Sequence, residues 1–141
     1  MSRKQIVISL AGLTLALGVT VPISWLAFGG RLAATGPDRA LEQAGTWIYG
    51  SQAVLAALVG AAAALLLGRQ ASVVRLVLLM FGAWLGELVV LTLGGNLVAN
   101  EIDPPVAWSW WLLATAGPLQ PVAASLGAVA ASVVGRLAPR A

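Results

Sequence analysis

The stretch Leu76–Leu97, LVLLMFGAWLGELVVLTLGGNL, decides the fold, because its 22 residues include a single charged side chain, Glu87. A helix needs about 20 predominantly apolar residues to cross the roughly 30 Å hydrocarbon core of a bilayer. Unpaired strands are too costly in lipid, and the stretch lacks the strict alternation of a membrane β-barrel strand. We therefore expect Leu76–Leu97 to form a membrane-spanning helix.

Three further apolar segments resemble this stretch, and none of them contains a charged residue. Together the four segments cover about two-thirds of the chain. The sequence therefore predicts an all-α, integral membrane four-helix bundle that forms one membrane domain over residues 1–141. The other three predicted spans are Ile6–Phe28, Trp47–Leu67 and Trp108–Val134.

The composition excludes several classes of protein. Of the 141 residues, 60% are hydrophobic and 9% are charged, whereas soluble domains carry about 25% charged residues. The chain has no Cys and no His, which removes disulfides, His or Cys metal ligation and His acid–base catalysis. The Lys and Arg residues form no cluster and there is no Gly-rich phosphate loop, so we expect no nucleic-acid binding, no cofactor and no enzymatic activity.

The placement of Lys and Arg predicts the topology. Cytoplasmic loops carry an excess of these residues, and an N-in, C-in arrangement puts six of them inside and two outside. Most aromatic residues near span ends fall at the predicted outer ends, as in an interfacial belt. The first span is longer than the 7–15 residues of a signal-peptide core, so we expect it to be retained. The inside set is Arg3, Lys4, Arg69, Arg75, Arg136 and Arg140, and the outside set is Arg31 and Arg39.

The connections predict how the spans begin, end and neighbour one another. The first external loop is expected over Gly29–Thr46, with Gly29-Gly30 and Gly36-Pro37 as helix breakers and a short surface helix over 37–43. The link Gly68–Ser72 is short, so we expect the second and third spans to be antiparallel neighbours. A second external loop covers Asn96–Ala107, where Asp103-Pro104 fits a helix start. Prolines interrupt the first and last spans at Pro22, Pro118 and Pro121.

Small residues recur at helical spacing and indicate packing faces. Helices in lipid associate through close backbone approach and polar contacts, and small residues permit that approach. The faces serve packing within the chain or, alternatively, contact with another subunit, which makes a protein partner or self-association an expectation. The candidate packing residues are Gly60 and Ala64 in the second span, Gly82 and Gly86 in the third, and Gly127 and Ala131 in the fourth.

Glu87 is the one charged residue within a predicted span. Such residues face the bundle interior or a wet cavity. Depth in the membrane can be counted along each predicted span at about 1.5 Å per residue. By this count Thr20, Gln52 and Thr115 lie at about the depth of Glu87, each on a different span. Gln120 lies deeper in the membrane, with no other polar residue at its level. No cation lies at that level, so we expect a protonated or hydrated Glu87. Three roles stay open: a proton or cation site, a hydrogen-bonded link between helices, or a charge that pairs with a partner subunit.

These features predict a small multi-pass protein that acts without catalysis, as an accessory subunit or assembly factor of a larger membrane complex. One alternative is a homo-oligomeric, proton-coupled transporter or channel for a small solute or ion, with Glu87, Gln52, Thr20 and Thr115 as its polar site. A further alternative is a phage-type holin. The residue usage, rich in Ala, Gly, Val and Arg with one Lys, favours a bacterial cytoplasmic membrane.

Overall fold

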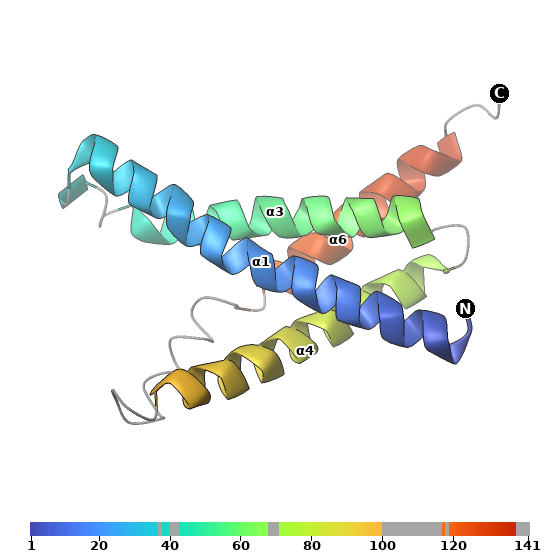
Figure 1. Ribbon diagram of the computed structural model, residues 1–141. Coiled ribbons are helices and arrows are strands. Elements are labelled where there is room, and N and C mark those ends of the chain that lie inside the picture. The colour runs from blue at the N-terminus through green and yellow to red at the C-terminus, as the bar shows by residue number, and fades with distance from the viewer. Residues whose placement is uncertain (37, 40–42, 68–70, 100–116, 118, 138–141) are drawn as a thin grey trace.

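Four α-helices of 19 or more residues make up most of the described chain in the computed structural model, which describes residues 1–36, 38–39, 43–67, 71–99, 117 and 119–137 (Figure 1). Three of them, α1, α3 and α4, are long and apolar enough to cross a membrane. The all-helical expectation is thus confirmed for the part of the chain that the structure describes. The helices are α1 (Arg3–Thr35), α3 (Ala44–Leu67), α4 (Val73–Ala99) and α6 (Leu119–Leu137).

Helix α1 has well-defined ends that differ from the predicted ones. At its start, the Gln5 backbone N–H donates to Ser2 Oγ and the Ser2 backbone N–H donates to Gln5 Oε1, which forms a capping box. The helix continues through Gly29-Gly30, so the prediction that this pair breaks it was wrong. Glycine costs about 1 kcal/mol in a helix interior relative to alanine, which weakens a long apolar helix without ending it. The helix ends at Gly36, whose φ of 79° suits glycine.

The last helix begins later than its predicted span. Gly117 is not helical and α6 starts at Leu119, so the segment 108–134 is not one continuous helix. Pro121 lies in the first turn of α6, where its missing N–H would have no partner within the helix. By contrast, α1 runs uninterrupted through Pro22. Residues 108–116 and Pro118 lie outside the described part of the chain.

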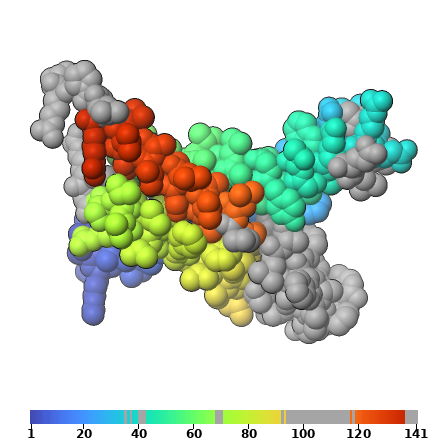
Figure 2. Space-filling model, turned by 180° about the vertical axis from the view of Figure 1, so that it is seen from behind, coloured from blue at the N-terminus to red at the C-terminus, as the bar shows by residue number. Residues whose placement is uncertain are grey.

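The helices form a ring in which chain neighbours are not always packing neighbours. Helix α1 contacts α3 and α4 on one face, and α6 contacts the same two helices on the other. Seen from behind, α6 lies between α3 and α4 (Figure 2). The expectation that the second and third spans pack side by side was wrong: α3 and α4 make few contacts. Each packs instead against α1 and α6, which separate them.

The two ends of the molecule differ in the chain segments that they hold. The N-terminus, the C-terminal ends of α3 and α6 and the start of α4 lie at one end (Figure 1). The C-terminal end of α1 and the start of α3 lie at the other end. Residues at the first end include Arg3, Lys4, Arg75 and Arg136.

Small side chains make up much of the interior, and many large apolar side chains lie on the outside. The main core cluster includes five alanines, among them Ala56, Ala83 and Ala124, each with no exposed surface. By contrast, Leu15 is 69% exposed and Leu58 is 60% exposed. In a water-soluble bundle the large apolar residues form the core. Leu17, Leu76 and Met80 are also buried, but in the described part of the chain more large apolar side chains are exposed than buried. The bundle interior therefore relies on close helix approach at small residues together with a few large side chains.

Candidate functional site

Glu87 lies on the buried face of α4 and is 1% exposed. Leu76, Met80, Ala83 and Glu87 are all buried and follow one another at spacings of four, three and four residues. This spacing places them on one face of the helix. Glu87 therefore points into the bundle, as predicted, because it lies on the face of α4 that packs against α1 and α6.

Gln120 connects Glu87 to helix α1. Its Nε2 lies 3.3 Å from Glu87 Oε1, 3.0 Å from Thr20 Oγ1 and 3.1 Å from the Leu17 carbonyl oxygen. A carboxamide nitrogen has two protons, so these three acceptors share two donors. Gln120 is itself 1% exposed. Residues of α1, α4 and α6 are therefore joined by one side chain; we call Glu87, Gln120, Thr20 and the Leu17 carbonyl the polar cluster.

The hydroxyl groups of Thr20, within the polar cluster, and Ser24, one turn further along α1, bond to the backbone of their own helix. Thr20 Oγ1 donates to the Leu17 carbonyl at 2.7 Å, and Ser24 Oγ donates to the Thr20 carbonyl at 2.7 Å. Both residues are buried. Because the Thr20 hydroxyl donates its proton to Leu17, its oxygen remains free to accept from Gln120.

The polar cluster leaves two buried oxygen atoms without a hydrogen-bond partner among the described residues. These are Glu87 Oε2 and Gln120 Oε1. Gln52 Nε2 and Ser125 Oγ are likewise buried and unpartnered within that part of the chain. Unpaired polar atoms inside a protein are costly, and each one calls for an explanation such as a water molecule or an ion. The interior thus has acceptor capacity that the described residues do not use.

The predicted site residues are only partly brought together. Thr20 and Glu87 meet through Gln120, whereas Gln52 is buried on α3 and makes no hydrogen bond to them among the described residues. Thr115 lies outside the described residues. The prediction that Gln120 lies deeper and alone was wrong. That prediction measured depth along one helix over 108–134, whereas α6 begins at Leu119 and puts Gln120 in its first turn.

A signal for Gln120 and Ser24 was present in the sequence. Gln120 precedes Ala123, Gly127 and Ala131 at spacings of three, four and four residues, which places it on the same helical face as the small residues. Ser24 follows Thr20 by four residues and shares its face. Gln120 could have been identified by including polar residues in the packing face of the fourth span. Ser24 could have been identified by following the face of Thr20 along the first span.

The candidate packing residues on α3 and α6 lie against each other. A Cβ atom added to Gly60 would collide with the Ala124 carbonyl, and one added to Gly127 would collide with the Ala57 carbonyl. Ala64 is buried in a second core cluster, and Ala131 packs against that cluster. These small residues allow backbone contact between the two helices.

The candidate packing residues on α4 face α1. A Cβ atom added to Gly82 would lie 3.1 Å from Leu10 Cδ2, and one added to Gly86 would lie 2.8 Å from Thr14 Oγ1. The Thr14 hydroxyl donates across the same interface to the Ala83 carbonyl at 3.1 Å. All four candidate glycines thus face another helix of the same chain.

Metal-ligating residue types do not gather in the described part of the chain, where no group of three or more His, Cys, Asp or Glu could hold a metal ion. The chemistry available in the polar cluster is therefore that of one carboxyl group, one carboxamide, one hydroxyl and one backbone carbonyl. Comparison of the chain with protein-family models, curated proteins and solved structures gave no match.

Proposed function

We propose that the protein is a multi-pass protein of the bacterial cytoplasmic membrane and that it acts without catalysis, as an accessory subunit or assembly factor of a larger membrane complex. The observation that carries the proposal is an exposed apolar surface around a buried polar cluster. Large apolar residues are exposed on α1, α3 and α4, while Gln120 donates to both Glu87 and Thr20 inside. Lipid is the solvent in which such a surface is stable.

Charges and aromatic residues support an orientation with both termini in the cytoplasm. Arg3, Lys4, Arg75 and Arg136 belong to the end that holds the N-terminus and the end of α6, and such an excess marks the cytoplasmic side. At the other end, Trp25 and Phe28 pack edge to face with ring centroids 6.1 Å apart. The Arg31 guanidinium lies 5.3 Å from the centroid of the Trp47 ring. Such aromatic groups are typical of a membrane interface.

The polar cluster supports a structural role for Glu87 in this proposal. Its carboxyl group is 1% exposed and bonds to a residue of its own chain, so it does not present a charge on the outside of the bundle for a partner. In lipid, hydrogen bonds between helices stabilise a bundle by about 0.6 kcal/mol each. The surfaces left for a partner are then the exposed apolar faces of the helices.

Purification from the native host in a gentle detergent, followed by native mass spectrometry, tests the proposed role. We expect a heavier partner protein at a fixed ratio. A lone monomer or a homo-oligomer would contradict an accessory subunit. Because the chain has no native cysteine, labelling of Ser2→Cys and Asp38→Cys with an impermeant reagent tests the topology separately. The reagent should reach position 38 from outside the cell and position 2 only after lysis.

A second candidate function is proton or cation binding for transport, and the unpartnered Glu87 Oε2 and Gln120 Oε1 favour it. Flux into proteoliposomes tests this function. Glu87→Gln should abolish the flux, because the amide keeps a hydrogen-bonding group and removes the ionisable one. Asp38→Asn makes the same chemical change at an exposed carboxyl group and should leave the flux unchanged. Equal flux in wild type and Glu87→Gln would remove this function.

A further inference from the structure

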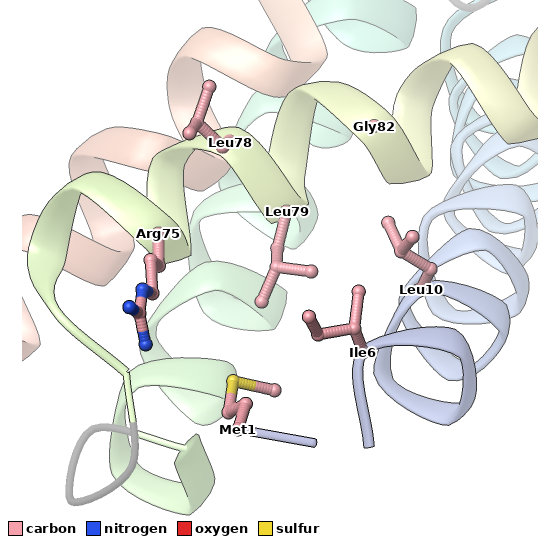
Figure 3. A pocket seen from close by; sticks show the side chains of 7 residues that line it. All are labelled: Met1, Ile6, Leu10, Arg75, Leu78, Leu79 and Gly82. Atoms are coloured by element: carbon pink, nitrogen blue, oxygen red, sulfur yellow. The ribbon is translucent and has the colours of Figure 1, made fainter. Parts of the chain in front are cut away.

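A groove of about 440 Å³ opens between α1 and α4 at the end of the molecule that holds the N-terminus (Figure 3). Its lining side chains are apolar except for the guanidinium group of Arg75. The lining residues are Met1, Ile6 and Leu10 from the start of the chain, and Arg75, Leu78, Leu79 and Gly82 from α4.

The two ends of the groove differ in their chemistry. At Gly82 the surroundings are apolar, because a Cβ atom added there would lie 3.1 Å from Leu10 Cδ2. Arg75 lies seven residues earlier on α4, about 10 Å away along the helix axis. Figure 3 shows its guanidinium group at the opposite end of the groove from Gly82. The groove therefore joins an apolar interior to a cationic mouth.

Charge at this end of the molecule favours an anionic occupant. Arg75 is exposed, and the two carboxylates among the described residues lie elsewhere. Glu87 is 12 residues further along α4, and Asp38 follows the far end of α1. Lys4 is also exposed at this end and adds positive charge without lining the groove. An anion at the mouth would thus meet an available guanidinium, which is suited to bidentate contact with phosphate.

We propose that this groove binds an anionic phospholipid of the cytoplasmic leaflet, with an acyl chain between α1 and α4 and the headgroup phosphate on Arg75. The proposal rests on the membrane orientation proposed above, which puts Arg75 at the cytoplasmic surface. Basic pockets between helices at that surface are recognised sites for anionic lipid headgroups. An acyl chain matches the apolar walls, and the guanidinium provides the preference for an anionic headgroup.

Native mass spectrometry of the detergent-purified protein, titrated with phosphatidylglycerol or phosphatidylcholine, tests the headgroup contact. We expect phosphatidylglycerol to bind more tightly, and Arg75→Gln to weaken that binding about fivefold, as for one cationic contact near an anionic surface. Arg75→Lys should retain most of the preference. Lys4→Gln removes a charge at the same end but outside the groove and should change binding less than twofold. Equal binding of the two lipids, or an unchanged Arg75→Gln, would overturn the proposal.

A second pair of variants tests the acyl-chain contact. Leu78 is 65% exposed and lines the groove, so Leu78→Trp should fill part of it while the helix still folds. Leu85 lies two turns further along α4, is 55% exposed and does not line the groove. We expect bound lipid of both kinds to fall several-fold in Leu78→Trp and to persist in Leu85→Trp. The same lipid loss in both variants would contradict the site. This result is independent of whether a protein partner co-purifies, so it can fail without the proposed function failing.

Discussion

Between α3 and α6, glycine and alanine bring two backbones into contact, whereas around Glu87 three helices are joined by polar side chains. The first contact contains no side chain that can move aside, since Gly60 and Gly127 each face a carbonyl group of the other helix. The second depends on Gln120, whose Nε2 serves three acceptors. A rigid contact tolerates no added volume, while a polar contact is sensitive to loss of hydrogen-bonding groups. The comparison predicts different responses to substitution.

The largest effect is expected from Gly60→Leu, which should lower the free energy of unfolding by at least about 3 kcal/mol. Added volume in a packed interior costs about 1–3 kcal/mol when side chains can adjust, and here a backbone carbonyl would have to move. Unfolding by dodecyl sulfate in mixed micelles, followed by tryptophan fluorescence, measures the change. Gly50→Leu lies on the same helix, where an added Cβ meets nothing within 4 Å, and should be nearly neutral. Similar losses in both variants would contradict the backbone contact.

An intermediate effect is expected from Gln120→Leu, which removes the side chain that joins the three helices in the polar cluster. Losing its bonds to Thr20, Glu87 and the Leu17 carbonyl should cost about 1–2 kcal/mol, since hydrogen bonds between membrane helices average about 0.6 kcal/mol. The same unfolding assay applies. Gln52→Leu is the matched control, because its buried Nε2 has no hydrogen-bond partner among the described residues. It should be neutral or stabilising. If the two substitutions cost the same, the polar cluster does not hold the helices together.

The smallest effect is expected between Gly86 and Thr14, where a glycine packs against another helix and a hydroxyl group donates across the same interface. Gly86→Ala should change the free energy of unfolding by less than about 1 kcal/mol. Its Cβ would lie 2.8 Å from Thr14 Oγ1, and this crowding opposes the gain of about 1 kcal/mol that alanine has over glycine in a helix interior. Thr14→Ala should cost about 0.6 kcal/mol through the lost bond to the Ala83 carbonyl. The double variant should lose less than the sum, since the second change makes room for the first. Strict additivity in this cycle would show that the two residues do not share a contact.

The helices could be predicted from the sequence because each depends on a run of consecutive residues. The apolar run Leu76–Leu97 lies within α4, and Trp47–Leu67 lies within α3. Helix ends were harder to predict. Of the two predicted breakers, α1 passes through Gly29-Gly30 and stops at Thr35, with Gly36 as its C-cap. The position of a helix end depends on the neighbouring segments and their packing as much as on the local residues.

The arrangement of the helices and the members of the polar cluster were harder to predict. A short link between α3 and α4 implied that they pack together, yet each packs on α1 and α6. Depth along a span is reliable only when the helix is continuous. The count along each span assigned Thr20 and Glu87 to one layer, and both contact Gln120. Gln120 itself was assigned to another layer, because that count assumed a continuous last helix whereas α6 begins at Leu119.

The position of α6 between α3 and α4 (Figure 2) implies an order of assembly during synthesis. The ribosome delivers α1, α3 and α4 first, and α3 and α4 make few contacts of their own. Until α6 emerges, Gly60 has no Ala124 carbonyl against it and Glu87 has no Gln120. The nascent protein thus passes through a stage with an open side, when Glu87 has not yet met Gln120. Delivery of the last described helix closes the bundle and ends that stage.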